Sequence, residues 1–148
     1  YYPEMILAGR RLNDNMGSYV AKEVSKLMTK KHIHVADSHV LIMGITFKEN
    51  CPDHRNTRVI DLVKEFKSFN CDVDVYDPWV NKDQAQYEYN IKFIDKPIKG
   101  KYDAIVIAVA HDEFKILTED QIRAFGKDSH ILYDIKYLLK ANESDGRL

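Results

Sequence analysis

The sequence is poor in cysteine, in long apolar runs and in net charge, and each shortage excludes a class of protein. Its 148 residues include two cysteines, Cys51 and Cys71, which are too few for a disulfide framework and lack the spacing of metal ligands. We therefore expect a protein of the reducing cytoplasm. No apolar run is long enough to span a membrane, and no signal peptide is visible. A formal net charge of −1 argues against a general nucleic-acid binder, so we expect neither nucleic acid nor membrane as a partner.

The patterns of several well-defined sites are also missing. No catalytic triad, zinc site or phosphate-binding P-loop is present. His32 and His34 form a His-x-His pair, but two imidazoles without a third ligand make a poor metal site, and we interpret them as part of a solvated connector. Cys51 and His54 share one loop, although closeness in sequence does not make a nucleophile–base pair. We expect no bound metal and interpret Cys51 as an inert or merely accessible thiol.

The length fits one domain with an appendage, large enough to bury a core without disulfides or metals. Apolar residues at three- and four-residue spacing predict a helix from about Glu4 to Lys30. Beyond it, apolar runs alternate with amphipathic stretches. We expect strands at 40–46, 72–76, 91–94, 102–110 and 129–134. We expect helices between Thr57 and Asn70, at 81–89 and at 118–125. Asn56 or Thr57 can cap the first of these helices, and Gly126 is expected to end the last one.

This alternation predicts an α/β fold, Rossmann-like and doubly wound, whose mostly parallel sheet has helices on both faces and is preceded by a long helix. The expected division is a helical segment at 1–31, a ligand-binding domain at 38–139, and a polar tail at 140–148 that frays. The chain opens on Tyr1 rather than methionine, and we expect it to belong to a longer polypeptide.

The stretch from Val40 to Val63 is the expected first strand, loop and helix of that domain, where such folds collect ligands. Its loop has one glycine, Gly44, where a dinucleotide fingerprint has three, and it carries cationic side chains instead. Because loops after parallel strands share one sheet edge, we expect Lys48 and Lys136 to face the same crevice. Two cations there suit a phosphate or pyrophosphate. The alternative is that both are ordinary surface lysines.

Two carboxylates near this edge have more than one interpretation. Asp77 ends the second expected strand, where dinucleotide-binding folds place the acid that contacts a ribose hydroxyl. An Asp-Pro turn explains it as well. Asp53 can form a local ion pair with Arg55, which is compatible with Arg55 also reaching a ligand.

The sequence as a whole resembles a known family. The segment GITFKENCPDHRNTRVIDLV is similar to the signature G-x-x-F-K-x-x-x-x-D-x-R of the C-terminal domain of UDP-glucose/GDP-mannose dehydrogenases. The segment YYPEMILAGRRLNDNMGSYV resembles the end of that family's central helix, and DVDVYDPWV, YDAIVIAVAHDEF and LYDIKYLL resemble its later strands. The resemblance covers essentially the whole chain. It is strongest to the branch of UDP-N-acetylglucosamine and UDP-N-acetylgalactosamine 6-dehydrogenases of Vi-type and O-antigen polysaccharide synthesis.

The resemblance implies an enzyme with an NAD-binding domain, a central helix that mediates dimerisation or higher homo-oligomers, and a C-terminal domain that binds a UDP-sugar. Such enzymes oxidise the C6 alcohol to a carboxylate in two steps, through a catalytic cysteine. That cysteine and the domain that mainly binds NAD would lie upstream of Tyr1, so this chain alone would be inactive. The alternative from another class is a non-catalytic nucleotide-binding or regulatory α/β module.

Site residues are implied by the same matches. Phe47 and Lys48 match the substrate-binding pair of the motif, Arg55 matches an arginine that reaches NAD across the interdomain cleft, and Asp53 matches the acid that orders the loop. Lys136 stands where better-known members have an arginine after Asp-Gly. It is implied to contact substrate, although lysine keeps the charge and loses the bidentate fork.

Overall fold

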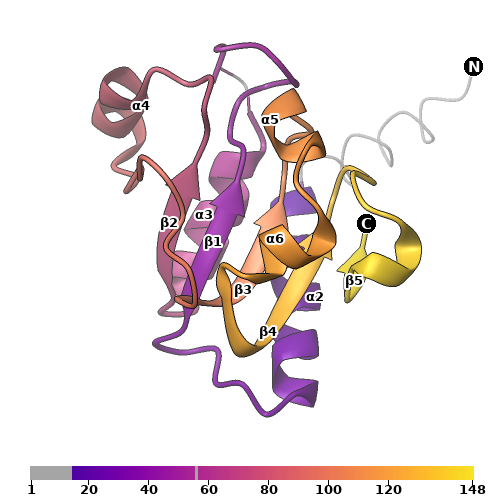
Figure 1. Cartoon of the computed structure of the whole chain (residues 1–148). Helices are drawn as coiled ribbons and strands as arrows, with labels where there is room; N and C mark the ends of the chain where they lie inside the picture. The colour runs from indigo at the N-terminus through magenta and orange to yellow at the C-terminus, as the bar shows by residue number, and fades with distance from the viewer. Residues whose placement is uncertain (1–14, 56) are drawn as a thin grey trace, which may run out of the picture.

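Five parallel strands form the centre of the molecule (Figure 1). The structure, a computed structural model, describes residues 15–148 except residue 56. The strands are β1 (His39–Met43), β2 (Asp72–Tyr76), β3 (Tyr102–Ile107), β4 (Gly126–Asp134) and β5 (Gly146–Arg147). Their order in the sheet is β2-β1-β3-β4-β5, and every neighbouring pair is parallel. The predicted parallel α/β sheet is confirmed.

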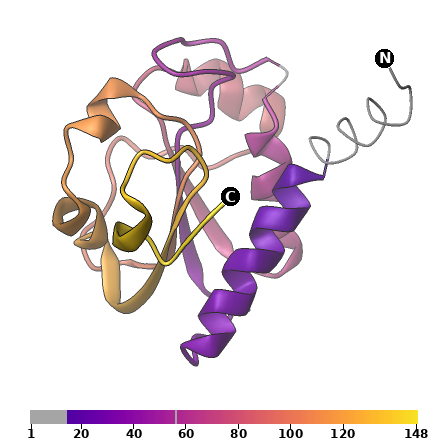
Figure 2. The same cartoon turned by 90° about the vertical axis from the view of Figure 1, so that its right-hand side faces the viewer.

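Helices cover both faces of the sheet, as predicted. They are α2 (Met16–Lys30), α3 (Val59–Ser68), α4 (Lys82–Tyr89), α5 (Asp112–Lys115), α6 (Glu119–Arg123) and the 3₁₀ turn η1 (Ala141–Glu143). In Figure 2 the indigo α2 lies along one side of the sheet, and the orange segments of α5 and α6 lie on the other. None of the described helices is long and apolar enough to cross a lipid bilayer.

Alternation along the central strands divides the core in two. In β1, Val40 and Ile42 pack under α2 and α3, while Leu41 and Met43 face α5 and α6. All four of these side chains are fully buried. A strand covered on both faces is apolar at every position, which explains the unbroken run in the sequence.

Local signals in the sequence confirm two element ends. Asn70 adopts φ 64° after α3, as expected of a left-handed stop. Thr118 caps α6 in a capping box with Gln121. The hydroxyl of Thr57 accepts a hydrogen bond from the backbone N–H of Val59. Asn56 and the predicted helix start near Glu4 lie outside the described residues.

Three expectations are wrong. The segment 91–94 forms a single bridge, between Phe93 and Val75, rather than a strand. Gly126 does not stop a helix but begins β4, where a Cβ would come within 2.4 Å of the His130 ring. The segment 140–148 does not fray, because it contains η1 and β5 and pairs in parallel with β4 through Tyr133 and Asp134. Short polar segments carry no apolar periodicity, so the sequence alone does not show whether they pair with another strand.

Candidate anion-binding site

A hollow of about 330 Å³ opens at the carboxyl ends of β1, β3 and β4. The sheet order changes direction between β1 and β3, and doubly wound folds bind ligands at this switch point. Lys48, from the loop after β1, and Lys136, from the turn after β4, both line the hollow. The expected convergence of these two side chains on one crevice is therefore present in the structure.

The lining combines positive charge with apolar surface. Arg58 adds a third cation and Glu49 a single carboxylate, so positive charge is in excess. Arg58 also lies 4.0 Å from Asp61 on the next turn of α3. Phe47 leaves 59% of its surface exposed beside Lys48, and Val109 contributes to the wall. An anion with an attached apolar or aromatic group would find both complements here.

The single glycine of the loop serves chain packing. Gly44 has φ +96°, and a Cβ at this position would lie 2.5 Å from the Cβ of Val109. The carbonyl oxygen of Met43 accepts a hydrogen bond from the N–H of Ala108. Gly44 thus lets the chain after β1 pass close to the chain after β3. The hollow lies between these two segments.

Asp77 organises the base of the site without facing the hollow. Its side chain is fully buried, and Oδ1 accepts hydrogen bonds from the N–H groups of Trp79 at 2.7 Å and Val80 at 3.1 Å. Oδ2 accepts from the N–H groups of Ile45 at 2.7 Å and Thr46 at 3.2 Å. The turn interpretation of Asp77 is confirmed. Both oxygens are engaged within the chain, so a ribose hydroxyl has no oxygen to meet.

His111 is the fifth partner of Asp77. Its fully buried ring places Nε2 at 2.9 Å from Asp77 Oδ2. Burial opposes ionisation of Asp77, but the hydrogen bonds from His111 and the Ile45 amide outweigh it and lower the pKa of the carboxyl. Asp77 therefore stays a charged acceptor. The sequence alone assigns His111 no role, because nothing in it pairs this residue with one 34 positions away.

Lys136 lies on a turn held by another buried carboxylate. Asp134, 1% exposed, accepts hydrogen bonds from the N–H groups of Lys136 at 3.1 Å and Leu139 at 2.8 Å. The N–H of Ile135 donates to the carbonyl of Ile107 at 3.0 Å. Tyr137 takes φ 55° to complete the turn. The backbone of Lys136 is thus fixed relative to β3.

Arg55 lies at a different hollow. It donates to Asp53 through Nε at 3.0 Å and Nη2 at 3.2 Å, which is the predicted ion pair. These hydrogen bonds lower the pKa of Asp53 to about 2. The carbonyl of Asp53 accepts from the N–H of Phe47 at 2.7 Å, which joins the two parts of the loop. With 80% of its side chain exposed, Arg55 borders a hollow of about 400 Å³ that also touches α4.

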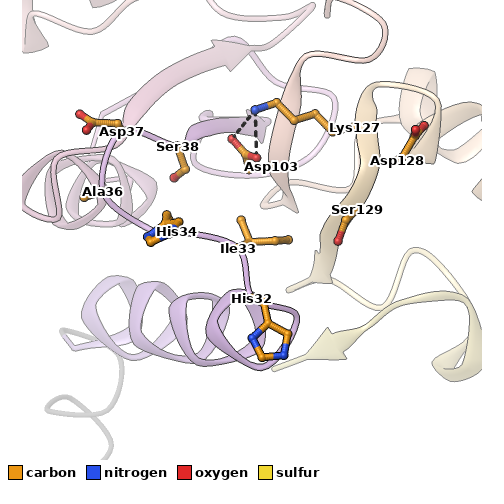
Figure 3. Close-up of a pocket in the computed structure, with 10 residues that line it drawn as sticks. All are labelled: His32, Ile33, His34, Ala36, Asp37, Ser38, Asp103, Lys127, Asp128 and Ser129. Carbon is orange, nitrogen blue, oxygen red and sulfur yellow. Dashed lines mark hydrogen bonds and ion pairs between the residues drawn. The ribbon is translucent and has the colours of Figure 1, made fainter.

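The remaining candidates do not assemble into sites. A hollow of about 530 Å³ at the amino ends of the strands contains both His32 and His34 (Figure 3). Its cation, Lys127, is 3.1 Å from the carboxylate of Asp103 and so is neutralised. No cluster of metal-ligating side chains exists within the described part of the chain. His54 lies edge-on to Tyr89, with ring centroids 5.6 Å apart, rather than bonding the nearby thiol.

Comparison with known proteins places this geometry in a family. Residues 41–141 match the family model described as UDP-glucose/GDP-mannose dehydrogenase family, UDP binding domain. The UDP-N-acetyl-D-glucosamine 6-dehydrogenases of Salmonella typhi and Pseudomonas aeruginosa are 56% and 55% identical over all 148 residues. The chain spans 35% of the length of each of these two relatives.

Solved structures show the same fold. The UDP-D-ManNAc dehydrogenase of Pyrococcus horikoshii superposes with a TM-score of 0.78 at 24% identity, over 99% of this chain and 34% of that one. An NDP-N-acetyl-D-galactosaminuronic acid dehydrogenase of Methanosarcina mazei Go1 gives 0.81 at 20% identity, over 97% of this chain and 30% of that one. With its switch-point hollow and the family match over most of its length, the chain belongs to the UDP-glucose/GDP-mannose dehydrogenase family and contains its UDP binding domain.

Proposed function

We propose that this chain is the substrate-binding part of an NAD-dependent nucleotide-sugar 6-dehydrogenase. The enzyme would oxidise the C6 alcohol of a UDP-N-acetylhexosamine to the carboxylate of a UDP-hexuronate in two steps. One observation carries the proposal: Lys48 and Lys136, from loops after different strands, line one hollow at the switch point. The two relatives above, named UDP-N-acetyl-D-glucosamine 6-dehydrogenases, support the choice of sugar class.

The roles of the individual side chains follow from their chemistry. Lys48 and Lys136 would neutralise the two phosphates of UDP, since an ammonium group meets phosphate oxygens as a mobile point charge. Phe47 would cover an apolar or aromatic part of the ligand, because its exposed ring lies beside Lys48. Asp53 would order the loop through its contacts with Arg55 and Phe47.

NAD would be bound mainly by another part of the enzyme. The crevice of this domain lacks the three-glycine fingerprint, and Gly44 is used for packing. Arg55 suits contact with a cofactor phosphate better than contact with a ligand in the hollow that Lys48 and Lys136 line. Its guanidinium is exposed and borders a separate hollow. The segment 1–31 would be the end of a central helix that assembles a homodimer or higher oligomer. The free thiols of Cys51 and Cys71 suit a cytoplasmic protein.

Calorimetric titration of UDP into the 148-residue chain tests the site. Lys48→Ala should weaken binding by about 10- to 100-fold, because a charged hydrogen bond contributes about 1.5–3 kcal/mol. Lys136→Ala should weaken it in the same direction. The matched control is Lys26→Ala on α2, whose side chain is 71% exposed and paired with Glu23, and it should change nothing. Equal UDP affinity of the parent and the Lys48 variant would remove Lys48 from the site.

Steady-state kinetics of the intact enzyme test the role of Arg55. Arg55→Ala should raise the KM for NAD more than the KM for the UDP-sugar, and Arg55→Lys should recover part of the loss. The reaction itself is followed by NADH production from a panel of UDP-sugars, while the 148-residue chain alone should be inactive. An intact protein that binds UDP but reduces no NAD would favour the non-catalytic module instead.

A further inference from the structure

We infer that His111 is a positioning residue that holds the Lys48 loop from both sides. This inference rests on the proposed role of Lys48 in ligand binding. A buried histidine, far in sequence from the loop, would fix the backbone position from which the Lys48 side chain extends. The two ring nitrogens act on the two ends of the segment 46–50.

The Nδ1 side fixes the far end of the loop. The N–H of Asn50 donates to His111 Nδ1 at 2.9 Å. Asn50 Oδ1 in turn accepts from the N–H of Asp112 at 2.9 Å. Asn50 adopts φ 56°, a left-handed conformation that asparagine tolerates better than most residues. Two hydrogen bonds thus attach one loop residue to the chain after β3.

The Nε2 side fixes the near end. Thr46 Oγ1 lies 3.2 Å from His111 Nε2, and the same hydroxyl donates to the carbonyl oxygen of Lys48 at 2.9 Å. Thr46 also donates its N–H to Asp77 at 3.2 Å. The backbone of Lys48 is therefore tied through Thr46 on one side and Asn50 on the other. Both ties end on the same imidazole.

The hydrogen-bond inventory allows one tautomer. A backbone N–H can only donate, so Nδ1 of His111 must present its lone pair to Asn50. The ring proton then lies on Nε2, where it is shared between Asp77 Oδ2 at 2.9 Å and Thr46 Oγ1 at 3.2 Å. Asp77 remains an anionic acceptor because its pKa is lowered, and it selects this tautomer. The carboxylate thus acts on the loop directly at the Thr46 amide and, at Asn50, through the ring.

Burial excludes direct contact between His111 and a ligand. The ring is fully buried, stacked against Trp79 at 6.2 Å between centroids and edge-on to Phe114 at 5.4 Å. It does not line the hollow that contains Lys48 and Lys136. His111 can therefore influence the site only through the loop that it holds.

Two conservative substitutions separate the two ring nitrogens. In His111→Asn, Oδ1 takes the place of Nδ1 and can still accept from Asn50. In His111→Gln, Nε2 takes the place of the ring Nε2 and can still donate to Asp77. We expect His111→Asn to be the less stable to denaturant, because Asp77 loses a donor. We expect it nevertheless to bind UDP within about threefold of the parent, since the contact to Asn50 survives and Thr46 keeps its own hydrogen bonds to Asp77 and to the Lys48 carbonyl.

His111→Gln should show the opposite order. It keeps the buried carboxylate satisfied and should be the more stable variant, but UDP binding should weaken by about tenfold and the Asn50 amide should exchange faster with solvent. A purely structural histidine predicts that stability and affinity fall together. If the less stable variant is also the weaker binder, or if Asn50 exchange is unchanged in His111→Gln, the positioning role is wrong.

The tautomer can be measured without any ligand. In the parent chain, the ¹⁵N resonances of the ring should show His111 unprotonated at Nδ1 and protonated at Nε2. The reverse tautomer would overturn the inference, and this measurement decides it if either variant fails to fold. A parent chain with the expected tautomer that binds no UDP would refute the proposed function while leaving the loop attachment in place.

Discussion

Replacing the buried carboxylate of Asp77 tests how much of the fold depends on one side chain. Asp77→Asn keeps the shape but turns one acceptor oxygen into a donor amide. If the amide takes the place of Oδ2, it faces the N–H groups of Ile45 and Thr46 and the Nε2–H of His111. If it takes the place of Oδ1, it faces the N–H groups of Trp79 and Val80. At least two buried donors lose their acceptor in either orientation.

Each buried donor left unsatisfied costs about 1–3 kcal/mol, so two of them predict a loss of about 2–6 kcal/mol in the free energy of unfolding. Natural domains have only about 5–15 kcal/mol in total. Urea denaturation followed by circular dichroism measures the loss. The control is Asp95→Asn. The Asp95 carboxylate is 94% exposed and paired with Lys82, so the urea midpoint of this variant should equal that of the parent. A loss below about 1 kcal/mol for Asp77→Asn would show that the hydrogen bonds to this carboxylate are replaceable.

Further changes probe the loop corner and the C-terminal segment. Gly44→Ala should lower the free energy of unfolding by about 2 kcal/mol or more in urea, because its Cβ would meet Val109 at 2.5 Å in a conformation of positive φ. Unchanged stability would show that the two corners can separate. Arg123→Lys should lower the melting temperature by about 2–8 °C, since lysine cannot keep the contacts at 3.2 and 3.4 Å to both oxygens of Asp145. Burial opposes ionisation of Asp145, but hydrogen bonds from Arg123 and the Leu132 amide lower its pKa, so this stabilisation is present above about pH 4 and is lost as the pH falls further. The gap between parent and Arg123→Lys should therefore narrow at pH 3, and a gap that widens would contradict the assignment.

The apolar pattern of the sequence was sufficient for the architecture. Strand β2 was predicted at its observed bounds, 72–76, because its alternation and the Asp-Pro that ends it are local features. The expected strands 40–46 and 102–110 extend past the observed ends of β1 and β3, at Met43 and Ile107, because apolar residues continue into the corners of the site. In those corners the chain leaves the sheet while the side chains of Ile45, Thr46, Ala108 and Val109 stay buried.

The site was only half predictable. Lys48 and Lys136 could be brought together from topology, because a parallel sheet places the ends of its strands on one edge. The buried network beneath them could not, since the His111–Asp77 pair joins residues 34 positions apart and Asn50 is held by its backbone rather than by a recognisable side-chain motif. A buried hydrogen-bond network leaves no periodic signal in a single sequence.

The short strand β5 also bears on how the sheet ends. It pairs with only the last two residues of β4, which leaves most of that strand's outer edge uncovered. Side chains occupy the exposed backbone groups instead: Asp145 accepts from the N–H of Leu132 at 2.7 Å, and Lys31 donates to the carbonyl of His130 at 3.0 Å. A second sheet approaching this edge would have to displace both charges before it could form hydrogen bonds. The contacts that anchor the C-terminal segment thus also protect the domain against edge-to-edge aggregation.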